Sequence, residues 1–316
     1  MGASSKSFTS SVVTTRALKE HITWADIQSF DPEQITPFHH DLASEPLLSL
    51  ASLRPLANRM YERKEVKFKP PEPTELFSTR DTHSKGWSID EAFDRLEQPG
   101  SWLAIYHMAS DPLYADFCKD LLQELNRHIG RSDPGLHSPD LAIFLSSPPT
   151  ETPYHIDQHP VFFFQLKGRK LMDLWDSHDP EVVPPAAAEE FLCFQRQGVV
   201  RYNEALHSKV VEIELSPGEG VYWPATTPHY VRTQSYWATP GDGISLSFNI
   251  SYYTAATRKR LCVSAVNRLL RKRSTLHPLP YGKSPLRDNV KYPLGRAYLL
   301  ARRLITHEYL SKEQKL

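Results

Sequence analysis

Short apolar runs separated by turn signals dominate the middle of the chain. Clusters rich in Pro and Gly, such as Ser216–Gly220 and Thr239–Gly243, bound these runs. Short runs of this kind are typical of β-strands, and several in succession favour a sandwich or barrel. The pattern predicts strands at Trp102–Tyr106, Leu141–Leu145, Val161–Gln165, Lys170–Trp175, Val210–Leu215, Gly220–Trp223 and Ile244–Tyr253.

Helical spacing of apolar residues appears before and after this region. It covers Pro112–Ile129, Ala255–Arg273 and Leu294–Tyr309, which we expect to be amphipathic helices. Ser88 followed by Glu91 has the spacing of a capping box, so a short helix should begin there and stop before Pro99–Gly100.

Residues 1–85 differ in character from the rest. Prolines recur at positions 32, 37, 46 and 55 and cluster at 70–73. Prolines at this density favour extended segments and turns, so we expect no long helix there. Short helical patterns such as Thr23–Ile27 interrupt the section. We predict three parts: an irregular Pro-rich section, 1–85, packing on the core; a β core with leading helices, 86–254; and C-terminal helices, 255–316.

Composition narrows the class of protein. The chain has 316 residues, of which 40% are hydrophobic, and its three cysteines lie far apart. They form no zinc motif or disulfide framework, which favours a reducing, cytoplasmic setting. The N-terminus shows no secretory pattern, and Lys6 departs from the myristoylation pattern. No apolar stretch reaches the length of a membrane span, so we expect no membrane partner.

Charge is balanced overall but unevenly distributed. From Ala256 onward there are fifteen Lys and Arg against three Asp and Glu. Such asymmetry can mark a surface for nucleic acid or another acidic partner. Helices with solvated basic faces are the simpler interpretation, and we expect no nucleic-acid partner.

The segment Thr152–Asp157 offers candidate metal ligands. Side chains alternate along a strand, so His155 and Asp157, two apart, should lie on one face. A second imidazole, from His229, would complete two histidines and one carboxylate. That donor set is the facial triad of non-haem iron(II) oxygenases, which leaves coordination positions open. The His-x-Asp pair alone is weak evidence, because the chain contains 14 histidines.

The surrounding sequence adds specificity. Five ordered blocks resemble the JmjC hydroxylase signature and span about 100 residues: Thr152–Asp157, Phe163–Lys170, Leu215–Pro224, His229 and Ser245–Asn249. The chain is similar to asparaginyl-hydroxylase-like and cupin-like JmjC proteins. The resemblance implies a mainly β fold with flanking helices around a double-stranded β-helix (jelly-roll or cupin) core in residues 86–254. It also implies Fe(II) and 2-oxoglutarate as cosubstrate.

The same resemblance assigns cosubstrate residues. Lys170 matches the cation that binds the distal carboxylate of 2-oxoglutarate, and Thr152 matches a hydroxyl donor to it. Tyr106 is a candidate second donor, for which Trp102 competes. Asn249 matches a polar residue near the iron or cosubstrate. The implied reaction hydroxylates a small molecule or protein side chain and releases succinate and CO₂.

Other functions stay open at this point. A non-catalytic cupin-like binding or regulatory protein would use the same barrel, and so would a metal-dependent cupin of another reaction class or a JmjC N-demethylase. Specificity would reside in Ser177–Ala205 and the Pro-rich section. In similar hydroxylases the helices after the barrel form a homodimer, which would here involve Leu269, Leu270, Leu299, Leu300 and Leu304.

Overall fold

The computed structural model describes residues 20–23, 30–69, 87–237 and 243–306. Its strands are β1 Ile22–Thr23, β2 Thr36–His40, β3 Val66–Lys69, β4 Trp102–Ile105, β5 His137–Ser146, β6 Thr150–His155, β7 Val161–Lys167, β8 Lys170–Leu174, β9 Val211–Leu215, β10 Glu219–Trp223, β11 His229–Thr233 and β12 Ser245–Tyr253. Its α-helices are α1 Leu50–Glu62, α2 Ile89–Asp94, α3 Ala115–Ile129, α4 Pro185–Phe194, α5 Ala255–Arg273 and α6 Pro285–Thr306.

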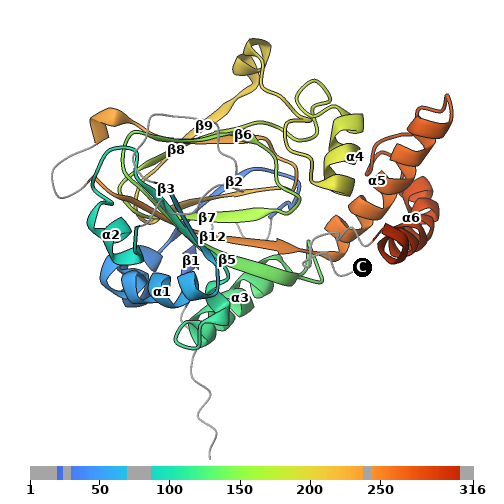
Figure 1. Ribbon diagram of the computed structural model, residues 1–316. Coiled ribbons are helices and arrows are strands. Elements are labelled where there is room, and N and C mark those ends of the chain that lie inside the picture. Colours follow the sequence, from blue (N-terminus) through green and yellow to red (C-terminus); the bar gives the residue numbers. More distant parts are fainter. Residues whose placement is uncertain (1–19, 24–29, 70–86, 238–242, 307–316) are drawn as a thin grey trace, which may run out of the picture.

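Two antiparallel sheets face each other (Figure 1). The larger has the order β1-β2-β10-β7-β12-β5-β4-β3, and the smaller has the order β6-β11-β8-β9. From β5 to β12 the chain passes repeatedly from one sheet to the other, so strands distant in sequence become neighbours. This order is that of a double-stranded β-helix, or jelly roll. The predicted fold class, mainly β with flanking helices, is confirmed.

Alternation along the strands divides the apolar residues between two layers. On β12, Leu246, Phe248 and Ile250 join a large core with residues of α1 and α3, outside the larger sheet. Figure 1 shows these helices below that sheet. The other face of the sheet contributes Phe163 and Trp223 to a second cluster, which contains Met172 and Leu174 of the smaller sheet. The second cluster therefore fills the space between the sheets.

The expectation of no long helix before residue 85 is wrong. Helix α1 runs over 13 residues with Pro55 inside it. Ser49 caps its start by accepting a hydrogen bond from the Ser52 backbone N–H. Its buried face contains Leu53, Leu56, Ala57 and Met60. Burial of that face outweighs the one hydrogen bond that proline cannot make.

Other expectations from the front section and the turns can be followed only in part. The helical pattern at Thr23–Ile27 and the turn at Thr239–Gly243 fall largely outside the described residues. Strands β1 and β2 pair beside β10, and β3 pairs with β4, so parts of residues 1–85 extend both edges of the larger sheet. The capping box at Ser88 and Glu91 is present, and α2 begins directly after Ser88.

The C-terminal helices pack against α4 at one end of the barrel (Figure 1). Helix α5 has the predicted bounds, whereas α6 begins at Pro285, earlier than predicted, and contains Pro293. Two basic residues of α5 pair with α4: Arg268 with Glu190 at 2.5 Å and Arg271 with Glu189 at 2.9 Å. Part of the basic surplus therefore serves internal packing.

The structure bears on two partners considered from sequence, a membrane and a second copy of the chain. None of the helices in the described residues is long and apolar enough to cross a membrane. Among the leucines expected at a dimer contact, Leu299 is fully buried within the chain, against the α4–α5 cluster. It is therefore not available to a second copy. The homodimer stays a prediction.

Candidate metal centre

Three predicted ligands converge at one end of the barrel. His155 is the last residue of β6 and pairs in register with His229, the first residue of β11. Asp157 Oδ2 lies 4.0 Å from His155 Nε2 and 3.6 Å from His229 Nε2. One ligand atom from each side chain lies within 4.8 Å of the other two. This group could hold one metal ion.

The hydrogen bonds of the two histidines suit metal binding. His155 Nδ1 lies 2.7 Å from the carbonyl oxygen of Pro153, and His229 Nδ1 lies 3.0 Å from that of Thr227. A carbonyl only accepts, so each Nδ1 carries the hydrogen, and in the neutral ring Nε2 keeps its lone pair. Both Nε2 atoms are the ones that face Asp157.

The electrostatics favour a neutral His229 and an ionised Asp157. Burial, reinforced by the charge of His155, lowers the pKa of His229 to about 3, which keeps this ring neutral. Burial alone would raise the pKa of Asp157, but His155 and His229 outweigh it and the pKa falls. Two imidazole nitrogens and one carboxylate oxygen are the donors of a facial triad, so the residues fit an iron(II) ion.

The expected reason for the approach of His155 and Asp157 is wrong. Strand β6 ends at His155, so Asp157 lies beyond it and alternation does not set its direction. A loop contact fixes it instead: the Thr226 backbone N–H donates to the carbonyl of Asp157 at 2.8 Å. Thr226 has φ +65°, a left-handed conformation that is strained for a β-branched residue.

Arg260 of α5 holds this loop from outside. Its guanidinium donates to the Thr226 hydroxyl at 2.7 Å and to the carbonyl of Ala225 at 3.1 Å. The chain of contacts Arg260–Thr226–Asp157 therefore connects a C-terminal helix to a candidate ligand. Sequence reasoning missed Arg260 and Thr226, because contacts across 34 positions of sequence leave no local pattern.

A bulge brings Thr152 to the same face as His155. Opposite β11, His155 pairs with His229 and Thr152 pairs with Val231, so β6 has one extra residue between them. Val231 packs on the cluster between the sheets, and directly opposed side chains share a face. Thr152 therefore faces the barrel interior, which unbroken alternation from His155 would have excluded.

Lys170 lies between the sheets with one polar partner. Its side chain is on the same face of β8 as Met172 and Leu174, and only 5% of the residue is exposed. Its Nζ donates to the Ser146 hydroxyl at 2.7 Å. Within the described residues no carboxylate lies at ion-pair distance from it, and burial lowers its pKa to about 7. A buried ammonium in this setting fits an external carboxylate.

The remaining two predicted residues lie on neighbouring strands. Tyr106 directly follows β4, and its ring contacts that of Phe144 with centroids 6.0 Å apart. Burial raises the pKa of Tyr106, and the charges of Asp140 and Asp157 raise it further. Asn249 on β12 faces away from the outer core, toward the barrel interior, because Phe248 and Ile250 face that core.

Further polar groups line the interior without having been predicted. The Ser247 hydroxyl donates to Gln165 Oε1 at 2.7 Å, and Gln165 Nε2 donates to the Ser245 hydroxyl at 3.0 Å. The buried indole N–H of Trp223 has no hydrogen-bond partner among the described residues, and its ring centroid lies 5.0 Å from that of His229. The alternation of Ser245, Ser247 and Asn249 with apolar residues is the signal that could have indicated this polar face.

A known protein family matches part of the barrel. The family model described as JmjC domain matches residues 141–257. That segment begins within β5, includes β6 to β12 and contains all three candidate metal ligands. No curated protein matches the chain significantly.

Among solved structures, similar ones include YcfD, a ribosomal oxygenase from Escherichia coli. One YcfD structure has 12% identity and a TM-score of 0.45, with 89% of this chain and 68% of that chain covered. YcfD in complex with cobalt and 2-oxoglutarate has 13% identity and a TM-score of 0.42, with 88% and 68% covered. These likenesses are weak, and neither assigns a ligand or substrate to this chain.

Proposed function

We propose that the protein is an Fe(II)- and 2-oxoglutarate-dependent oxygenase, a function supported by the match of the JmjC domain model to residues 141–257. The observation that carries the proposal is the combination of two sites in one barrel. A His155–Asp157–His229 donor set lies at one end of the barrel. The buried ammonium of Lys170 lies inside the barrel, where no carboxylate of the described residues pairs with it. A metal-binding cupin of another class needs only the first of these.

In the proposed enzyme, His155, Asp157 and His229 hold the iron through Nε2, a carboxylate oxygen and Nε2. The carbonyls of Pro153 and Thr227 keep both rings in the tautomer that coordination needs. Three protein ligands leave positions for cosubstrate and dioxygen. When bound, iron and 2-oxoglutarate supply the oxidation: 2-oxoglutarate, O₂ and a C–H bond give succinate, CO₂ and C–OH.

Lys170 binds the distal carboxylate of 2-oxoglutarate in this scheme. A carboxylate beside the ammonium favours its charged form and offsets the cost of burying it. Ser146 orients Nζ through its hydroxyl, and Thr152 and Tyr106 are proposed as hydroxyl donors to the same carboxylate. Asn249 contributes a polar side chain on the interior face of β12.

The apolar cluster between the sheets excludes water from the reacting groups. The substrate proposed is a small molecule or a protein side chain. Hydroxylation is the proposed outcome, and a hydroxylated carbon attached to nitrogen would release an aldehyde, which is the N-demethylase alternative. The region Ser177–Ala205, which contains α4, is proposed to contribute specificity.

Succinate production tests the proposal directly. Anaerobically loaded Fe(II) enzyme is given 2-oxoglutarate and air, and succinate is quantified for wild type, His155→Ala and Lys170→Ala. We expect wild type to form succinate slowly even without its substrate. His155→Ala should fall to background, and Lys170→Ala should raise the KM for 2-oxoglutarate by roughly ten- to a hundredfold, because a charge-assisted contact is lost.

Two matched variants separate the site from general damage. His277→Ala and Lys119→Ala remove the same residue types at exposed positions and should keep the wild-type rate. Absence of metal binding by wild type would reject the oxygenase proposal and leave a cupin-like binding protein. Equal loss of succinate in all four variants would mean that the assay reports folding rather than the site.

A further inference from the structure

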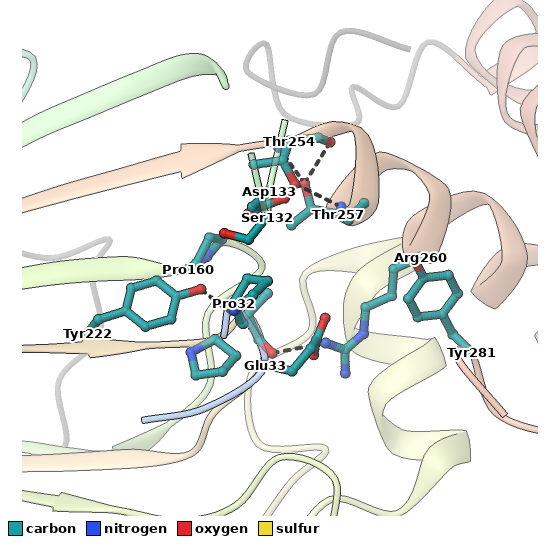
Figure 2. Close-up of a pocket in the computed structure, with 13 residues that line it drawn as sticks. Pro32, Glu33, Ser132, Asp133, Pro160, Tyr222, Thr254, Thr257, Arg260 and Tyr281 are labelled. Carbon is teal, nitrogen blue, oxygen red and sulfur yellow. Dashed lines mark hydrogen bonds between the residues drawn. The ribbon is translucent and has the colours of Figure 1, made fainter. Parts of the chain in front are cut away.

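A second cavity lies apart from the candidate metal centre. It has a volume of about 160 Å³ and is bounded by the Pro32–Glu33 segment, the end of β10 and the first turn of α5 (Figure 2). This is the volume of about five water molecules, enough for a ligand of a few non-hydrogen atoms. None of the three candidate metal ligands lines it. Prolines and alanines supply much of its wall, with charged groups at separate points.

Most of the charges around this cavity are already paired. Arg260 donates to Thr226 and Ala225, and its charge helps to lower the pKa of Glu33. The Glu33 carboxylate lies 3.0 Å from His178 Nε2. These groups therefore meet one another's charge without a ligand.

Asp133 is the exception. It is 4% exposed and lines the cavity, and its Oδ1 has no hydrogen-bond partner among the described residues. Burial raises its pKa to about 6, although the side chain of Thr254 acts in the opposite direction through a hydrogen bond, so the carboxylate is still mostly ionised at neutral pH. A buried carboxylate oxygen without a donor is costly, and a cationic donor is the group that relieves this cost best.

We propose that this cavity is a binding site for a small organic ammonium ligand, whose N–H groups donate to Asp133. Tyr222 and Tyr281 also line the cavity (Figure 2). Aromatic surface is attractive to alkylammonium groups, and the wall prolines Pro32 and Pro160 pack against the alkyl part. A metal ion is disfavoured, because the second lining carboxylate, Glu33, is bound to His178 and is not free to join Asp133 in a coordination shell.

The cavity lies beside the loop that contains Ala225 and Thr226, next to the candidate metal centre. Its wall includes Pro160, Ala225 and Arg260, which flank the contact between Thr226 and Asp157. A bound ligand would share the cavity wall with Arg260, the side chain that holds Thr226. The site is thus placed to sense or adjust the candidate metal centre from outside the barrel.

Binding of propylammonium to the full-length chain tests the proposal, with 1-propanol as the uncharged probe of the same size. Titrations followed by ligand-observed NMR should show saturable binding of propylammonium and at least tenfold weaker binding of 1-propanol, about the effect of one charge-assisted contact. This comparison needs no variant. Equal binding of the two probes, or no binding of propylammonium, would overturn the proposal.

Variants then locate the site. Asp133→Asn keeps the shape and removes the charge, and it should weaken propylammonium binding by about tenfold or more. Asp116→Asn, the same change at an exposed position of α3, should leave binding unchanged. Circular dichroism melts verify that both variants fold. Undiminished binding in folded Asp133→Asn would mean that the ammonium binds elsewhere, which rejects this site.

Discussion

At the scale of the residue, Lys170 is buried, and no carboxylate in the described part of the chain pairs with its ammonium. Its ammonium donates to a neutral hydroxyl, that of Ser146, in an apolar barrel. Holding a lysine there opposes stability, since burial favours its uncharged form. Such an arrangement is expected where a ligand, rather than the fold, requires the charge.

The pH dependence of 2-oxoglutarate binding follows from this setting. Burial lowers the pKa of Lys170 from 10.5 to about 7 in the ligand-free protein. Below pH 7 the ammonium is present and the affinity is full. Above pH 7 binding must take up a proton, so the affinity should fall by up to about tenfold per pH unit. Calorimetric titration of the metal-loaded protein from pH 6 to pH 9 measures this.

Lys170→Arg is the matched control for that titration. Arginine stays charged across this range, so affinity in this variant should be nearly independent of pH, whatever its absolute value. If both proteins lose affinity in parallel, the titrating group is not Lys170.

At the scale of the element, helix α5 supports the candidate metal centre from outside the barrel. Arg260→Gln shortens the side chain and removes the charge that holds Ala225 and Thr226. Without that anchor the strained Thr226 can relax, and Asp157 loses its fixed position. Because such supporting contacts are worth about ten- to a hundredfold in metal affinity, we expect a loss in that range.

Competition with a fluorescent chelator measures the affinity of Arg260→Gln. Arg271→Gln is its control: this residue lies on the same helix and is also part-buried, but it binds Glu189 of α4 and the carbonyl of Pro278 rather than Ala225 and Thr226. A metal affinity unchanged in Arg260→Gln would show that Thr226 holds Asp157 without help.

The contact between α5 and α6 depends on one glycine. A Cβ at Gly295 would lie 1.9 Å from the carbonyl oxygen of Cys262, so the two helix backbones could not keep their separation. Alanine favours a helix by about 1 kcal/mol over glycine. We nevertheless expect Gly295→Ala to lower the free energy of unfolding by ~1–3 kcal/mol, since overpacking of this kind costs more. Urea denaturation measures the free energy of unfolding of Gly295→Ala, and of Ala297→Gly as the reverse exchange at an exposed position of the same helix.

Many of the helices and strands could be predicted from sequence, and the predictions that were wrong share a cause. Apolar runs such as Val161–Gln165 and the cap at Ser88 are local signals, and the structure has them at the expected places. Helix α1 continues through Pro55 against a local rule, because burial of its apolar face outweighs the cost of the proline. Helix α6 likewise contains Pro293. The convergence of His155, Asp157 and His229 was predictable because His155 and Asp157 form a compact motif and the ordered JmjC-like blocks lead to His229. The bulge in β6 depends instead on pairing with a strand far along the chain.

At the scale of the whole molecule, the C-terminal helices project from one end of the barrel (Figure 1). On α6, Leu286, Val290 and Leu294 are 77%, 61% and 59% exposed and recur every four residues, which aligns them on one face. This face differs from the leucine set predicted for a homodimer, and we propose that a homodimer would instead bury Leu286, Val290 and Leu294. Light scattering should then give a dimer mass for wild type and a monomer mass for Val290→Asp. A monomeric wild type at micromolar concentration would reject the dimer.

The division of the candidate ligands along the chain has a mechanical consequence. His155 and His229 lie 74 positions apart in sequence, and the segment between them contains β7 to β10 and α4. A bound ion would staple the two ends of this segment together and stabilise only the folded state. Removing the metal should therefore lower the Tm. Amide hydrogen exchange should also quicken first near the two ends of the segment, with little change in the outer core around α1 and α3. The cofactor would then act as a clasp for the barrel as well as a reagent.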